Sequence, residues 1–176
     1  IRIASTFTHL SLVDPKWKAR THELLDFFMK DQRPGPGGTV NYDGSTELPA
    51  TGWYQWGEVV WRDKSHPGFI GDYPHTWVGS EFINAVRNMM VLERGDELVL
   101  AAGVTREWTA QEPGVRIENF PTPYGDISYS IRVVDYQTVL ELQTDARPPG
   151  GFTFVIPRKW RPTSATVDGK PAALIR

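Results

Sequence analysis

The sequence contains no cysteine, and this absence excludes disulfides, thiolate metal sites and catalysis by a cysteine nucleophile. A chain without cysteine is compatible with an oxidising compartment, such as that of a secreted or periplasmic protein, and also with a reducing one. No apolar run approaches the roughly 20 residues that a membrane-spanning helix requires. We therefore expect no membrane partner, and the compartment stays open.

The chain also lacks an excess of charge of one sign. Its 176 residues include 19 lysines and arginines and 21 aspartates and glutamates, which gives a formal net charge of −2. Nucleic acids and anionic membranes attract proteins through basic patches, so this balance argues against both partners. Hydrophobic residues at 40% and charged residues at 23% are ordinary for a globular protein and argue against intrinsic disorder.

Two segments have the apolar periodicity of helices. Residues 16–30 carry a broad apolar face and follow Pro15, a residue favoured at the first helical position. Residues 77–93 place apolar side chains on one stripe, with Thr76 as the expected N-cap. We expect Gly95 to cap the C-terminal end of this second helix.

Beyond residue 95 the apolar pattern changes to the shorter period of strands. Apolar and polar residues alternate over 127–133, which is typical of a half-buried antiparallel strand, and Asp168-Gly169 is a hairpin-turn pair. Short strands separated by turn residues are predicted at 98–100, 115–117, 127–134, 139–142, 152–156 and 165–167. We therefore predict an α+β chain in which a small antiparallel β-sandwich spans residues 95–176.

A long irregular segment rich in aromatic residues joins the two predicted helices. Its run PGPGG at residues 34–38 excludes a helix or a central strand, although a short helical turn is expected within 53–61. The aromatic side chains here and at the start of the next helix are Tyr42, Trp53, Tyr54, Trp56, Trp61, Phe69, Tyr73, Trp77 and Phe82. Aromatic planes beside hydrogen-bonding groups suit a sugar ring. The alternative is that these aromatics form a core that anchors irregular backbone, with Trp61 and Trp77 foremost.

Two acidic residues of this segment are candidate catalytic groups. Glu58, between Trp56 and Trp61, is expected to be partly desolvated, an environment that suits acid–base catalysis. The alternative for Glu58 is an ion pair with Arg62 on a short helix. Asp72 either orients a substrate or a water, or caps a turn through its carboxylate.

Two further polar residues of the aromatic segment have open interpretations. His75 bonds either a ligand hydroxyl or a neighbouring carbonyl group. Glu81 falls in the first turn of the second predicted helix, where a negative charge is favourable without any ligand. His66 and His75 do not match a zinc-binding spacing, and no nucleophile-elbow or phosphate-loop motif is present. We therefore expect neither a metal nor another cofactor.

A longer motif carries a family resemblance. Residues 52–63 read GWYQWGEVVWRD, and residues 67–83 read PGFIGDYPHTWVGSEFI. Together with GDISYS at 125–130 and PPGG at 148–151, they resemble the end of the catalytic region in large bacterial glycoside hydrolase-like proteins. Such proteins are often described as discoidin or coagulation factor 5/8-type domain proteins. The resemblance runs from about residue 14 to the C-terminus.

The resemblance implies that residues 1–94 are the last helices of an incomplete (α/α)6, glucoamylase-like toroid, and that residues 95–176 are its β-sandwich domain. In such toroids the catalytic base is a carboxylate shortly before the last inner helix, so Glu58 is the best positional match and Asp72 the second. The general acid comes from the middle of the helical domain, upstream of Ile1. An inverting mechanism needs that acid roughly 6.5–9.5 Å from the base.

The function expected from this resemblance is hydrolysis of glycosidic bonds by general acid–base catalysis. Sugar rings would stack on Trp53, Trp56 and Tyr73. The remaining substrate contacts are assigned to Gln55, His75 and Glu81. The chain alone is expected to be inactive and to pair with its missing upstream region or with itself, because its helix faces would otherwise be exposed. The alternative is a non-catalytic carbohydrate-binding or structural β-sandwich module.

Overall fold

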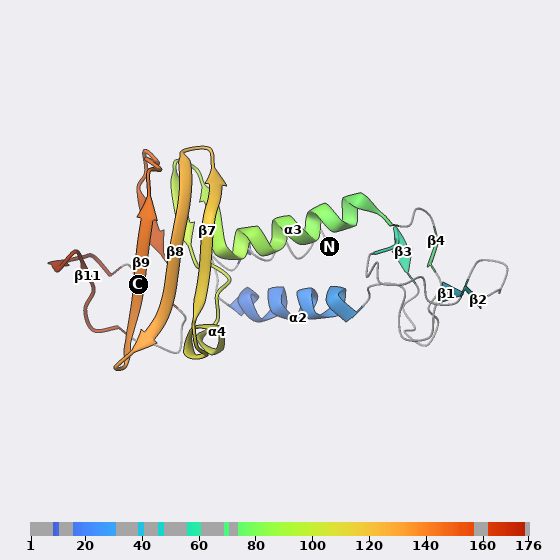
Figure 1. The fold of residues 1–176 in the computed structure, drawn as a ribbon, viewed down its shortest axis with the longest axis horizontal. Coiled ribbons are helices and arrows are strands. Elements are labelled where there is room, and N and C mark those ends of the chain that lie inside the picture. Colours follow the sequence, from blue (N-terminus) through green and yellow to red (C-terminus); the bar gives the residue numbers. More distant parts are fainter. Residues whose placement is uncertain are drawn as a thin grey trace.

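The computed structural model describes residues 9–10, 16–30, 39–40, 46–47, 56–60, 69–70, 74–156 and 162–174. Within these residues the fold is mixed α+β, and its strands are mostly antiparallel. Two long helices lie side by side, and the second of them leads into two three-stranded sheets (Figure 1). No helix of the described residues is both long and apolar enough to cross a membrane.

The two long helices, α2 (Lys16–Lys30) and α3 (Thr76–Met90), pack through their apolar faces. Leu25 of α2 is buried against Ala85 and Met89 of α3. The partly buried side chains that complete the contact are Leu24, Phe82 and Val86. The prediction of a helix over residues 16–30 is confirmed, and its apolar face is the one that meets α3.

α3 starts one residue earlier than predicted and has a different cap. Thr76 is already helical, and the N-cap is His75, whose Nδ1 accepts a hydrogen bond from the Val78 N–H at 3.3 Å. Preferences for hydroxyl, carboxyl and amide side chains at this position do not predict a histidine cap. The first turn contains no acidic residue, and Glu81 lies one turn later than predicted.

The C-terminal end of α3 also differs from the prediction. The helix ends at Met90, and the residues predicted to continue it form strand β5 (Val91–Arg94). β5 pairs antiparallel with β6 (Glu97–Leu100), so Gly95, with a φ of 59°, lies in a hairpin turn rather than at a helix cap. Val91 and Leu92 suit a helix or a strand, and the pairing with β6 decides between the two.

Two three-stranded sheets share the main apolar core. β7 (Val115–Thr122), β8 (Gly125–Val134) and β9 (Gln137–Thr144) form an antiparallel meander, and β10 (Phe152–Phe154) pairs in parallel with β6. Both sheets contribute to one buried cluster, which consists of Val91, Leu98, Leu100, Ala101, Val104, Ile127, Tyr129, Ile131 and Ala146. The alternation predicted for 127–133 is confirmed at the buried positions of β8.

A hydrogen-bonded junction joins α3 to both sheets. The Met90 carbonyl accepts one hydrogen bond from the Ala101 N–H at 2.8 Å and another from the Tyr129 hydroxyl at 3.0 Å. Tyr129 is 2% exposed, and burial raises the pKa of its phenol well above the usual range. The guanidinium of Arg87 lies 4.1 Å from the ring centre of Phe120, which ties α3 to β7 as well.

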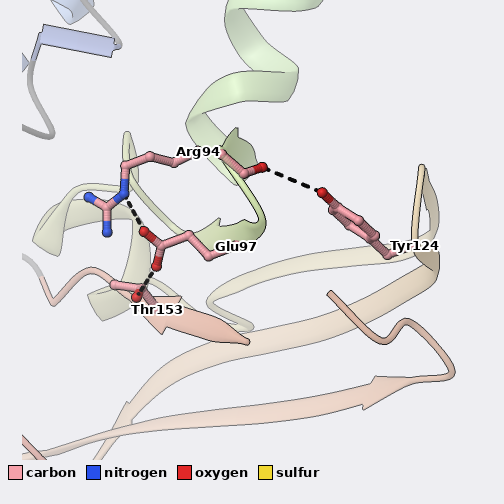
Figure 2. A network of polar contacts seen from close by, with 5 residues as sticks. Arg94, Glu97, Tyr124 and Thr153 are labelled. Atoms are coloured by element: carbon pink, nitrogen blue, oxygen red, sulfur yellow. Dashed lines mark hydrogen bonds and ion pairs between the residues drawn. The ribbon is translucent and has the colours of Figure 1, made fainter. Parts of the chain in front are cut away.

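The β5–β6 hairpin is held by a polar network (Figure 2). Glu97 accepts a hydrogen bond from the Arg94 Nε at 2.5 Å and another from the Thr153 hydroxyl of β10 at 2.7 Å. The hydrogen bond from Arg94 is the main reason that the pKa of Glu97 is lowered. Tyr124, in the β7–β8 turn, donates its hydroxyl to the Gly95 carbonyl at 3.4 Å and so connects the two sheets.

The remaining elements are short. They are α4 (Arg106–Ala110) and three two-stranded ladders, β1 (Thr39–Val40) with β2 (Thr46–Glu47), β3 (Val59–Val60) with β4 (Phe69–Ile70), and β11 (Thr166–Val167) with β12 (Lys170–Pro171). The hairpin at Asp168-Gly169 is confirmed, with φ values of 49° and 73°. The helical turn expected within 53–61 is wrong at Val59–Val60, which pair as a strand.

The α+β class is confirmed, but the described helices do not form a toroid. α2 and α3 are a pair, and α4 is a short helix of 5 residues that contacts β8. The incomplete (α/α)6 toroid therefore stays a proposal. The predicted domain boundary between residues 94 and 95 falls in the β5–β6 turn and stays a prediction.

Candidate functional site

The structure describes part of the predicted site, namely Trp56, Glu58, His75 and Glu81. Outside the described residues lie Trp53, Gln55, Asp72 and Tyr73, whose roles stay predictions. The candidate site is therefore built from the segment 56–60 and the N-terminal end of α3.

Trp56 anchors this segment to both long helices. Its indole Nε1–H donates to the Phe28 carbonyl near the end of α2 at 2.8 Å. Its ring centre lies 4.9 Å from that of Phe82 on α3, at an interplanar angle of 35°. With 8% of the residue exposed, the indole has little free face for a sugar ring. The geometry therefore favours the structural alternative for this aromatic.

His75 holds the segment beside the start of α3. The backbone N–H of His75 donates to the Trp56 carbonyl at 2.8 Å. Its ring Nδ1 accepts a hydrogen bond from the Val78 N–H and so caps the helix. Because Nδ1 accepts this bond, the proton of the neutral ring is assigned to Nε2. His75 thus accepts a hydrogen bond from a backbone N–H through Nδ1, a role that neither sequence alternative included.

Glu58 is exposed, so the expectation of a partly desolvated carboxylate is wrong. The residue lies between two fixed points of the backbone. The anchored Trp56 lies two residues before it, and the β3–β4 ladder begins directly after it, with Val59 opposite Ile70. A side chain on such a support keeps its position better than one on a free loop, which is what catalysis by a carboxylate requires. The alternative partner, Arg62, lies outside the described residues.

Trp77 is the exposed aromatic at this end of α3. The prediction that Trp77 belongs to the core is wrong, since the residue is 55% exposed. Its ring stacks loosely on that of His75, with centres 6.4 Å apart and planes at 25°. Glu81 follows one helical turn later and is half-buried. Sequence reasoning missed the exposure of Trp77 because its place beside a predicted helical stretch suggested burial.

A second cluster of titratable groups joins α2 to the segment before α4. Lys18 donates from Nζ to the Val104 carbonyl at 2.6 Å, and burial lowers its pKa to about 8 against the opposing effect of Glu107. His22 lies with Nε2 at 2.9 Å from the Gly103 carbonyl, and burial is likewise the main cause of its lowered pKa. Perturbed groups often mark active sites, but both side chains here bond backbone carbonyls and connect two elements.

The α3 end combines an exposed carboxylate, an exposed aromatic and an imidazole donor, which are groups that bind sugars and move protons. Within the described part of the chain, no group of three or more histidines or carboxylates is placed to hold a metal ion. A scan against protein-family models, a search of curated proteins and a search of solved structures give no match to this chain.

Proposed function

We propose that this chain is the C-terminal part of a glycoside hydrolase-like protein of (α/α)6 type, and that the N-terminal end of α3 faces the carbohydrate. The observation that carries the proposal is the exposed Glu58 held between the buried Trp56 and the β3–β4 ladder. Trp77 adds an exposed aromatic at the same end of α3. This combination is the one expected of a sugar site with a catalytic carboxylate.

In this proposal Glu58 is the general base. Its carboxylate takes a proton from a water molecule, and the oxygen of that water attacks the anomeric carbon as the glycosidic bond breaks. A carboxylic acid from the upstream region gives a proton to the leaving oxygen. Nε2–H of His75 donates to a sugar hydroxyl, and the ring of Trp77 packs on the C–H face of the sugar.

The helix pair supports the assignment to a larger helical assembly. Several large apolar residues of α2 and α3 are exposed, including Phe27 at 42%, Met29 at 49% and Ile83 at 59%. Exposed apolar residues on packed helices are expected where further helices cover them. The predicted roles of Trp53, Gln55, Asp72 and Tyr73 belong to the same proposal.

The proposal is tested on the chain expressed together with its upstream region. Release of reducing sugar is measured over a panel of oligosaccharides for the wild type, for Glu58→Gln and for Glu93→Gln, an exposed carboxylate of β5 that serves as the matched control. Loss of a general base lowers the rate about 100- to 10,000-fold, so Glu58→Gln is expected to be nearly inactive. Full activity of Glu58→Gln would remove its assigned role.

A further inference from the structure

A polar face of the β7–β8–β9 sheet is separate from the α3 end. Alternation along β8 turns Ile127, Tyr129 and Ile131 into the core and leaves Ser128 and Ser130 on the opposite face. The strand register places Gln143 opposite Ser128 in β9. Figure 1 shows this sheet beyond the C-terminal end of α3, whereas β3 and the start of α3 lie at the other end.

This face is hollowed into a shallow groove of about 600 Å³ that crosses all three strands. A second hollow of about 400 Å³ continues it and shares Asn119, Ser128 and Gln143 with it. The groove coincides with a β-bulge in β7 between Ile117 and Phe120, where Asn119 adopts a φ of 49° and donates its N–H to the Ser128 hydroxyl at 2.9 Å. Bulges bend a strand and redirect its side chains, so the hollow is a built feature of the sheet.

The charges that line the groove compensate each other. Arg132 binds Glu141 through two hydrogen bonds, from Nη1 at 2.8 Å and from Nη2 at 2.9 Å. Arg116 forms an ion pair with Glu118 on the same strand, β7. Because each guanidinium of the first hollow faces a carboxylate, that hollow favours neither an anion nor a cation as its ligand. The second hollow carries two carboxylates, those of Asp126 and Asp145, which disfavour an anionic ligand.

The hydrogen-bonding groups that remain suit a neutral ligand with many hydroxyls. Asn119 and Gln143 each carry an amide donor and an amide acceptor, and Ser128 adds a hydroxyl that can do both. The ion pair between Arg132 and Glu141 fixes a donor beside an acceptor, the spacing that neighbouring sugar hydroxyls present. We propose that this groove binds a neutral oligosaccharide along the sheet, as a second carbohydrate surface apart from Glu58.

This inference goes beyond the proposed function and shares only its ligand class. Binding in the groove needs no catalysis and no contact with the α3 end, so each idea can fail while the other stands. A glycan held on the sheet would keep a polymeric substrate near the α3 end and raise its local concentration there.

The test is calorimetric titration of the full chain with neutral hexasaccharides of glucose, xylose and mannose, and with hexagalacturonate as the anionic probe. At least one neutral hexasaccharide is expected to bind. Gln143→Ala removes the amide shared by both hollows and is expected to weaken that binding about fivefold, whereas Gln137→Ala, on the same strand outside the groove, leaves it unchanged. Thermal unfolding of Gln143→Ala like that of the wild type shows that the fold is kept.

Three results would overturn the inference. They are the absence of binding by every neutral hexasaccharide, tighter binding of hexagalacturonate, and equal affinities of the wild type and Gln143→Ala. Binding that is unchanged in Gln143→Ala but lost in Glu58→Gln places the ligand at the α3 end, which overturns the groove and supports the proposed function. Binding that is weakened in Gln143→Ala and unchanged in Glu58→Gln supports the groove.

Discussion

The amine of Lys18 makes the stability of this fold depend on pH in an unusual direction. Burial lowers its pKa from 10.5 to about 8, although Glu107 acts in the opposite direction. The folded state therefore disfavours the charged amine, whereas the unfolded chain keeps it charged up to about pH 10.5. Between these two values, the unfolded chain binds the extra proton, and the free energy of unfolding rises as the pH rises.

The size of this effect follows from the two pKa values. From about pH 7 to about pH 9.5, the contribution of Lys18 to the free energy of unfolding increases by about 2 kcal/mol. His22 adds little to it, because its pKa is lowered from 6.5 and most rings are already neutral over this range in both states. Lys18→Met removes the titrating amine, so the variant is expected to lack this rise.

The measurement is urea unfolding followed by tryptophan fluorescence at a series of pH values, for the wild type, Lys18→Met and Lys170→Met. Lys170 is exposed on β12, and its variant is expected to follow the wild-type curve. The difference between the wild type and Lys18→Met cancels the titration of other groups. If that difference stays constant from about pH 7 to about pH 9.5, the amine is not desolvated as the structure indicates.

Two further predictions concern the packing of the helix pair. Trp56→Phe keeps a ring against α3 but removes the donor to the Phe28 carbonyl, so the free energy of unfolding should fall by about 1–3 kcal/mol. The control is Trp77→Phe, at an exposed tryptophan. Equal urea midpoints for the two variants would contradict the anchoring role of Trp56. Gly103→Ala places a methyl carbon 2.3 Å from the Cγ of Met89 and 2.8 Å from its Cα. The free energy of unfolding is expected to fall by about 2 kcal/mol and the melting temperature by about 4–8 °C. An unchanged melting temperature would show that α3 shifts to admit the methyl group at no cost in stability.

The sequence predicted those elements whose side chains repeat with one clear period. The helix over residues 16–30 and the alternating strand around Tyr129 belong to this group, because a buried face repeats along the element itself. The end of α3 was predicted wrongly because Val91 and Leu92 suit either period. Their partners lie on β6, so tertiary pairing, rather than local propensity, decides.

The candidate site was harder to predict for a related reason. Aromatic residues in an irregular segment have no period that separates buried from exposed side chains. Trp56 is buried because a carbonyl at the end of α2 accepts its indole N–H, and Trp77 is exposed although it belongs to a helix with an apolar stripe. The aromatic neighbours of Glu58 predict it as a candidate, but the fixed backbone on both sides of it depends on the β3–β4 pairing, which no local pattern indicates.

Met90 is the last residue of α3, and its carbonyl accepts hydrogen bonds from the Ala101 N–H and from the Tyr129 hydroxyl. Carbonyls at a helix end usually face water and allow the last turn to fray. Here fraying would break two bonds to buried groups of the sheets, so unwinding of α3 from this end and melting of the β core belong to one cooperative event. The opposite end of α3 is capped by His75 and, within the described part of the chain, has no such coupling to the β core, so the first local opening of the helix should begin there.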